Sequence, residues 1–195
     1  MKRLLAGLLV ACSALLQARA ENEPEVILEI LSDQSQFLPA EKLPVTVRIS
    51  NHSGRTLKFG RDNEWLGFTL EEVKGGVVGR RGDPKVEGEF PLETATRGKF
   101  SIDLSPYFDL TRPGSYRLTA QMRVPELNLI VTSSPLNFDI IPGSIVWSQT
   151  FGVPPKAGDP DGTVDRRTYL LQQANYLKEV KLYVRVTDAT TGATY

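Results

Sequence analysis

Short runs in which apolar and polar residues alternate recur through most of this chain, and they constrain its fold more than any other feature. Val45, Val47 and Ile49, for example, alternate with Thr46 and Arg48. Successive side chains of a strand point to opposite faces, so such a run predicts a strand with one buried face. The same alternation occurs at Val26–Ile30, Leu66–Glu71, Phe100–Leu104, Tyr116–Arg123 and Leu136–Ile140.

Residues typical of turns separate these runs. Val, Ile and Thr total 39 against 12 Ala, which also favours strands. Six or seven short strands punctuated in this way predict an all-β chain built around a β-sandwich. The predicted turns are Asn51–Gly54, Lys74–Gly76, Arg81–Pro84 and Arg112–Gly114.

Two stretches of the chain resemble immunoglobulin-like domains of secreted bacterial proteins. Phe37–Glu41 followed by Val45–Asn51 resembles their strands A and B, and Ile102–Leu110 followed by Pro113–Leu118 resembles their E–F corner. Residues 24–141 are similar to the sandwich that precedes deuterolysin-like metallopeptidases and, less closely, to the intracellular proteinase inhibitor of bacilli. The resemblance implies an immunoglobulin-like sandwich but no activity, because this architecture hosts unrelated functions and the metallopeptidase His-Glu-x-x-His motif is absent.

The apolar faces of the predicted strands define an expected core. The residues expected to be buried include Val47, Trp65, Phe68, Leu118 and Phe138. Tyr116 occupies the position of a tyrosine corner, in which the ring packs inside and the hydroxyl bonds to backbone a few residues upstream. That acceptor is expected between Leu110 and Pro113.

The first twenty residues have the composition of an export signal. Lys2 and Arg3 precede an apolar run, Leu4–Leu16, that is too short to span a bilayer. Ala18–Ala20 fits the small-x-small rule for signal peptidase, so residues 1–20 are expected to be removed and Glu21 to become the first mature residue. The sequence therefore predicts an exported protein, periplasmic or extracellular, with no transmembrane segment in the mature chain.

The alternative to plain export is lipoprotein processing. Leu9–Cys12 resembles a bacterial lipobox, which would place a lipid anchor at Cys12. Cys12 is also the only cysteine, so the mature chain cannot use disulfides and its core must supply the stability.

Charge and composition exclude several classes of function. The formal net charge is +0, and removal of residues 1–20 takes away three of 23 basic and none of 23 acidic residues, leaving −3. A basic footprint for nucleic acid is therefore absent. His52 is the only histidine, and the chain has no phosphate-binding loop, nucleophile elbow or Cys-x-x-Cys motif. We predict no catalytic residue, no cofactor site and no metal site.

A few motifs have a functional interpretation beside a simpler one. His52 is expected in a solvated turn, and Asn51-His52-Ser53 matches a glycosylation sequon by chance in a bacterial-type chain. Arg81–Asp83 matches an integrin-type tripeptide but is expected to be an ordinary turn. Asp159–Gly162 with Asp165 faintly resembles a calcium loop, although the spacing fails the EF-hand pattern.

Residues 143–195 differ in character from the rest. Ile145–Phe151 is a candidate strand, and Gly152–Thr163 is expected to be a loop. Residues 166–178 fit either a helix or a strand, of which we favour the strand, because Leu182–Thr187 alternates clearly. Asp188–Gly192 then predicts a turn after which little chain follows, so this part is expected to be a short, incomplete β-rich segment.

The aromatic residues of this C-terminal third have two interpretations. The expectation is that they line a small core or the interface with the sandwich. The alternative is an exposed aromatic surface that binds a sugar or a protein. The residues concerned are Trp147, Phe151, Tyr169, Tyr176 and Tyr183.

The sequence predicts three segments: a signal peptide at 1–20, an immunoglobulin-like β-sandwich at 21–142, and a β-rich segment at 143–195. The expected function is that of an exported, non-enzymatic interaction or structural module of the bacterial cell envelope, with another protein or an envelope component as partner. The alternative is a proteinase-inhibitor-like or pro-domain module that binds a peptidase through a loop or edge strand. A hydrolytic enzyme with an Asp/Glu pair built across strands is a third, weaker interpretation, because neighbours such as Glu71 and Glu72 point to opposite faces.

Overall fold

The structure is a computed structural model that describes residues 24–62, 64–86, 88–154, 164–176 and 179–195. The described part is all-β, as the sequence predicts, with one 3-10 turn, η2 (Pro125–Leu127). It contains no helix long and apolar enough to cross a membrane. The predicted signal peptide, its cleavage site and Cys12 lie outside the described residues.

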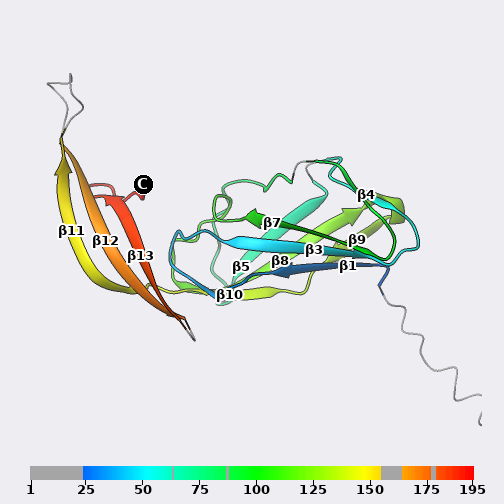
Figure 1. Cartoon of the computed structure of the whole chain (residues 1–195), viewed down its shortest axis with the longest axis horizontal. Helices are drawn as coiled ribbons and strands as arrows, with labels where there is room; N and C mark the ends of the chain where they lie inside the picture. The colour runs from blue at the N-terminus through cyan, green and yellow to red at the C-terminus, as the bar shows by residue number, and fades with distance from the viewer. Residues whose placement is uncertain (1–23, 63, 87, 155–163, 177–178) are drawn as a thin grey trace, which may run out of the picture.

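Two facing sheets form a sandwich in the larger part of the molecule (Figure 1). One sheet has the order β1 (Val26–Leu31), β3 (Pro44–Asn51), β7 (Thr96–Asp103). The other has the order β2 (Gln36–Phe37), β10 (Leu136–Ile140), β8 (Gly114–Val124), β5 (Leu66–Glu72). The chain thus enters through β1 in one sheet and crosses to β2 in the other, where β2 runs parallel to β10. This arrangement confirms the predicted all-β sandwich.

The core of the sandwich follows the predicted faces. All five residues expected to be buried are at most 3% exposed. The exception is β7, where Phe100 and Ile102 are only half-buried while Leu104, just beyond the strand, is buried. The expectation of a fully covered face was therefore wrong for β7, because Phe100 and Ile102 line an open cavity beside this strand.

Tyr116 forms the predicted tyrosine corner. Its hydroxyl donates to the carbonyl oxygen of Arg112 at 2.7 Å, and its ring stacks on Phe138 with centroids 5.6 Å apart. Burial of the side chain raises the pKa of the hydroxyl above its usual value.

Three short strands of the sandwich have no counterpart in the sequence prediction. β4 (Leu57–Phe59) pairs with β6 (Phe90–Leu92), and β9 (Leu129–Thr132) pairs with the end of β8. Between β9 and β10, buried Ser133 exchanges hydrogen bonds of 2.9 and 3.0 Å with the backbone of Ala120. Strands of three or four residues are too short for alternation to reveal them.

The C-terminal residues form a separate three-stranded antiparallel sheet, with the order β11 (Ser144–Val153), β12 (Asp165–Tyr176), β13 (Glu179–Asp188). The strand interpretation is confirmed for residues 166–176, while 177–178 lie outside the described residues. The predicted loop at Gly152–Thr163 was wrong at its start. Gly152 and Val153 still belong to β11, because they pair with Arg166 and Asp165.

The predicted turn after β13 is present. The carboxylate of Asp188 accepts the backbone N–H groups of Thr190 and Thr191, at 2.8 and 2.6 Å. The chain then returns along β13, and Tyr195 donates its N–H to the carbonyl oxygen of Val186 at 3.0 Å. The last residues therefore cover one end of the outer edge of β13.

Side chains of β13 bind the loop between β1 and β3. Lys181 donates to the Oε1 atom of Gln34 at 2.8 Å, and the hydroxyl of Tyr183 donates to the Oε1 atom of Glu41 at 3.0 Å. Arg185 donates to the carbonyl oxygen of Pro39. Figure 1 shows the curved sheet at one end of the sandwich, where these polar contacts join the two parts.

Candidate functional site

An apolar groove opens at the edge of the sandwich beside β7. β7 pairs with β3 along its whole length, and no strand among the described residues pairs with its other edge. A cavity of about 470 Å³ lies along that edge. Its lining residues are Lys85, Val86, Phe90, Gly98, Lys99, Phe100, Ser101 and Ile102.

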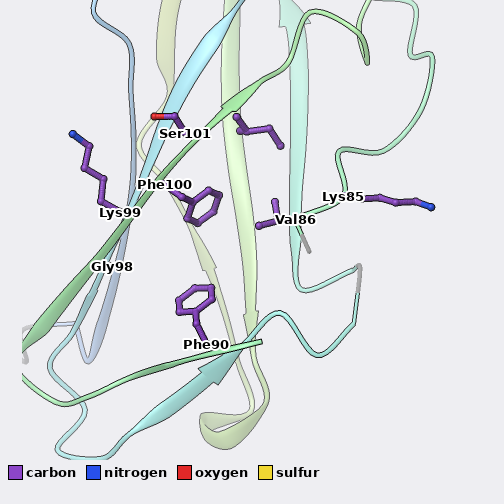
Figure 2. Close-up of a pocket in the computed structure, with 8 residues that line it drawn as sticks. Lys85, Val86, Phe90, Gly98, Lys99, Phe100 and Ser101 are labelled. Atoms are coloured by element: carbon purple, nitrogen blue, oxygen red, sulfur yellow. The ribbon is translucent and has the colours of Figure 1, made fainter. Parts of the chain in front are cut away.

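The groove has an apolar interior and a basic rim. Figure 2 shows Phe90, Phe100 and Val86 around the space between β7 and the segment that precedes β6. Lys85 and Lys99 extend away from that space on opposite sides. Neither lysine forms an ion pair within the described part of the chain. The rim therefore presents two ammonium groups to solvent or to a ligand.

A cluster of packed aromatic rings supports the groove from below. Trp65 is buried, and its ring centroid lies 5.8 Å from that of Phe90 and 6.1 Å from that of Phe100. Its indole N–H also donates to the carbonyl oxygen of Val86 at 3.4 Å. Phe59 packs on both Trp65 and Phe90, at 5.4 and 5.6 Å. Rings held on several sides have little rotamer freedom, so the floor is formed before any ligand arrives.

Gly98 leaves one inward position of β7 without a side chain. A Cβ atom placed there would lie 3.5 Å from Leu92 and 3.7 Å from Phe90, which is ordinary van der Waals contact. A larger side chain at this position would therefore enter the groove without a clash at its root.

The lining offers apolar contact and two ammonium groups, its one hydroxyl, that of Ser101, bonds to the Thr46 hydroxyl at 3.1 Å, and it holds no carboxylate or imidazole. No group of His, Cys, Asp and Glu suited to a metal ion occurs among the described residues. The groove is thus suited to holding an extended apolar segment rather than to acid–base chemistry.

The sequon residue Asn51 is buried and fully occupied. Its Nδ2 atom donates to the carbonyl oxygens of Arg55 and Leu92, at 2.8 and 2.9 Å. Its Oδ1 atom accepts the backbone N–H and the hydroxyl of Ser53, at 3.0 and 2.7 Å. An amide so engaged is not accessible to a glycosyl transfer reaction, whereas His52 is exposed in the turn as expected.

The Arg81–Asp83 tripeptide is tied back onto the protein. Arg81 binds the carboxylate of Asp109 at 3.1 Å, and Asp83 pairs with Arg80. Both charged groups of the tripeptide therefore have partners within the chain, in agreement with the ordinary-turn interpretation.

The calcium-loop candidate lies largely outside the described residues, which exclude Asp159–Gly162. Its remaining member, Asp165, pairs with Arg167 at 2.8 Å and accepts a hydrogen bond from the hydroxyl of Tyr195 at 3.2 Å.

One pair of acidic residues meets across elements, as the hydrolase interpretation requires. Glu72 and Asp109 line a single cavity of about 200 Å³ together with Tyr116. Hydrogen bonds from the Thr111 hydroxyl and N–H and the nearby Arg81 charge, opposed only by slight burial, lower the pKa of Asp109. A carboxylate with a lowered pKa is a poor general acid, so Asp109 is unsuited to protonating a leaving group.

The C-terminal aromatics do not form the expected core. Trp147 and Phe151 are each 45% exposed, because no described segment forms a second layer over that face of their sheet. Phe151 packs edge-on against half-buried Tyr169, with centroids 5.6 Å apart. Tyr183 does lie at the interface with the sandwich. The side chain of Tyr176 lies outside the described residues.

Sequence reasoning missed the groove. Phe100 and Ile102 were recognised as one strand face, but nothing in the sequence pairs them with Val86 and Phe90, which come from an irregular segment. One sequence signal pointed to the groove. The segment between Lys74 and Phe90 has no clear strand pattern, so it could not be expected to pair with the free edge of β7.

Comparison with known proteins adds little. No protein family model matches the chain, and no curated protein matches it. Among solved structures, the crystal structure of Spo0M, a sporulation control protein from Bacillus subtilis, is similar at 7% identity and a TM-score of 0.43. The alignment covers 84% of this chain and 80% of that one. Both measures of similarity are low, so function has to be argued from the surface of this chain.

Proposed function

We propose that the chain is an exported, non-enzymatic interaction module of the bacterial cell envelope that holds an extended segment of a partner protein along β7. The observation that carries the proposal is the apolar cavity of about 470 Å³ beside an unpaired strand edge. An extended segment bound there would add a strand to the sheet, and its backbone would pair with β7. The predicted signal at residues 1–20 supports the location.

The chemistry of the groove defines the segment that it fits. Alternate side chains of an added strand point to the same face, so every second residue would enter the groove between Phe90 and Phe100. These inward residues should be apolar and of moderate size. Lys85 and Lys99, on opposite sides of the groove, favour a segment that carries acidic residues, because opposite charges steer and orient the encounter.

A defined peptide tests this proposal. The probe is a fluorescein-labelled peptide in which three valines alternate with threonines and an aspartate stands at each end. Its binding to the mature chain is followed by fluorescence anisotropy, and the control is a peptide of the same composition in which the three valines are adjacent. Saturable binding of the alternating peptide, weaker for the control, is expected. Equal binding or no binding of the two peptides would overturn the groove proposal.

A matched pair of variants locates the binding. Gly98→Val puts a side chain into the groove, whereas Gly67→Val introduces the same residue into β5, where a Cβ atom meets nothing within 4 Å. We expect Gly98→Val to weaken binding by roughly tenfold or more, equivalent to about 1.4 kcal/mol. Gly67→Val should bind like the wild type. If both variants bind alike, the peptide lies elsewhere.

Export is tested independently of the groove. Mass spectrometry of the processed chain should find Glu21 at the amino terminus. A lipid on Cys12 would show that the chain is anchored to the envelope and not secreted. An amino terminus from which residues 1–20 have not been removed would contradict export.

A protruding loop supports the second candidate, a proteinase-inhibitor-like module. Val77 is 93% exposed between Gly76 and Val78. The loop is anchored beyond it, because the carbonyl oxygen of Gly79 accepts the N–H of Asp109 at 2.8 Å. An apolar residue at the tip of an anchored loop resembles the residue that an inhibitor offers to a peptidase. This candidate predicts inhibition of an elastase-type peptidase, lost in Val77→Asp and retained in Gly98→Val.

A further inference from the structure

The C-terminal sheet has an apolar face directed away from the sandwich, here called the outer face. Cross-strand partners point to the same side of a sheet, and the register aligns Trp147, Leu171 and Val184 in one row. Val184 is 74% exposed and Leu182 63% exposed. The apolar members of the outer face are Trp147, Phe151, Tyr169, Leu171, Val180, Leu182, Val184 and Val186, and the register places the uncharged polar residues Gln149, Gln173 and Asn175 among them.

The opposite face of the same sheet meets the sandwich. Lys181, Tyr183 and Arg185, which alternate with the outer-face residues of β13, bind the loop between β1 and β3. On β12, Gln172 and Ala174 lie on this inner side and are buried. The inner side is therefore covered at β13 and at the Gln172–Ala174 part of β12, whereas the inner-side residues of β11, such as Ile145 at 62%, are exposed. No described segment packs over the centre of the outer face.

The edge strand of this sheet lacks the usual protection against pairing. β11 runs for ten residues, Ser144–Val153, without a charged residue or a proline, and its outer edge pairs with no strand of the described chain. Natural edge strands are normally blunted by charges, prolines or strong bulges, because an open edge invites another chain. β11 has only one irregularity, between Ile145 and Trp147.

The charges of the outer face are paired among themselves at one end. Arg167 binds Asp165 at 2.8 Å and lies 4.5 Å over the ring of Tyr195. The hydroxyl of Tyr195 also approaches the carboxylate of Asp188 at 3.3 Å. The rest of the face is uncharged and mostly apolar, so a complementary surface must also be uncharged and mostly apolar, and the outer face of a second copy has this property.

The size of the face agrees with a weak dimer. Three strands about 4.8 Å apart and about nine residues long, at about 3.4 Å per residue, cover roughly 440 Å² in projection. Two copies would bury roughly 900 Å² in projection and more in accessible surface, which is near the lower end of specific interfaces at about 1,000–1,200 Å².

From these observations we propose that the outer face is the site at which a second copy of this chain docks, with the two C-terminal sheets packed face to face around a two-fold axis. In such an isologous contact each Val184 meets the apolar surface of the other copy. The contact leaves the groove at β7 accessible, because the groove is built on the sandwich. This inference does not depend on the proposed function.

The oligomeric state of the mature chain tests the proposal. Sedimentation velocity from micromolar to several hundred micromolar concentration should show a reversible shift from monomer to dimer. Val184→Lys should weaken the dimer by roughly tenfold or more, because an ammonium group without a partner is costly to bury. Phe151→Lys, on another strand of the same face, should have the same effect. The control, Val77→Lys, adds the same charge at an exposed apolar residue of the sandwich and should dimerise like the wild type.

Several outcomes would overturn the proposal. A chain that stays monomeric throughout the concentration range has no such interface, and a dimer unaffected by both outer-face variants uses another surface. Far-ultraviolet circular dichroism and the urea midpoint of each variant, at a concentration where the wild type is monomeric, should match those of the wild type, so that a loss of dimer reflects the surface and not the fold. A dimer that Gly98→Val abolishes would place the contact at the groove instead.

Discussion

The sandwich and the C-terminal sheet are built from the same kind of alternating sequence, yet they bury their apolar side chains to opposite extents. Leu118 in β8 is 0% exposed, whereas Val184 in β13 is 74% exposed. The difference is the second layer: β8 faces another sheet, and the outer face of β13 faces none within the described chain. Alternation thus specifies a strand with an apolar face, and burial of that face depends on a partner layer.

The two parts also differ in how polar groups are used. Asn51, buried in the sandwich, makes four hydrogen bonds within its own turn and to β6. Gln172, buried at the junction, has an Oε1 atom that accepts no hydrogen bond from the described residues. The hydrogen-bonding groups of Asn51 are therefore all satisfied within the sandwich. The junction is held by a few polar contacts, such as that between Tyr183 and Glu41.

The largest expected contrast is between two truncations of apolar residues. Leu118→Ala should lower the free energy of unfolding by about 2–5 kcal/mol, the usual range for a buried leucine. Val184→Ala should change it by less than about 0.5 kcal/mol, because the side chain is exposed. Urea unfolding of the monomer measures both, because Trp65 reports from the core of the sandwich and Trp147 reports from the C-terminal sheet. A large loss for Val184→Ala would mean that the outer face is covered.

The second contrast concerns the buried amides. Asn51→Ala should cost about 1–3 kcal/mol, because the carbonyl oxygens of Arg55 and Leu92 lose their donor. Gln172→Leu should leave stability unchanged or raise it by up to about 1 kcal/mol, since it removes a buried acceptor that has no partner. Thermal unfolding of the two variants compares them directly, and a destabilised Gln172→Leu would show that the long hydrogen bond from its Nε2 atom to the Pro142 carbonyl oxygen, at 3.5 Å, outweighs the unpaired acceptor.

A smaller contrast separates two tyrosine hydroxyls. Tyr116→Phe should cost about 0.5–1.5 kcal/mol, the value of one net hydrogen bond, because its acceptor is the Arg112 carbonyl within the sandwich. Tyr183→Phe removes a bond between the two parts and should leave the unfolding of the sandwich unchanged. Instead, amide exchange in β13 should become faster. If Tyr116→Phe is as stable as the wild type, the corner contributes no net stability.

The smallest expected effect is the pH dependence of the turn that Asp188 holds. The pKa of Asp188 lies below the usual aspartate value, because the N–H groups of Thr191 and Thr190 donate to its carboxylate. A carboxyl whose pKa is lowered by folding stabilises the turn fully at neutral pH, and this contribution is lost as the pH falls through the lowered pKa. The amide chemical shifts of Thr190 and Thr191 should follow that titration. Asp188→Asn should remove the dependence, and shifts that persist in it would assign the titration to another group.

Much of the sandwich could be read from consecutive residues. Alternation located most long strands and their inward faces, and Tyr116 followed from its position after Pro113-Gly114. These features are local, because a strand's faces depend on every second residue. The short strands β4, β6 and β9 could not be found in this way, since they exist only through their pairing with distant residues.

The amino-acid sequence by itself determined an all-β chain, the residues of its core and the tyrosine corner. Only the tertiary structure decided that Asn51 is buried, that Val86 and Phe90 meet Phe100 in a groove, and that Trp147 is exposed. The physical reason is the range of the interactions: backbone geometry sets which way a side chain points within two residues. What lies opposite that side chain depends on segments tens of residues away, whose approach no local pattern records.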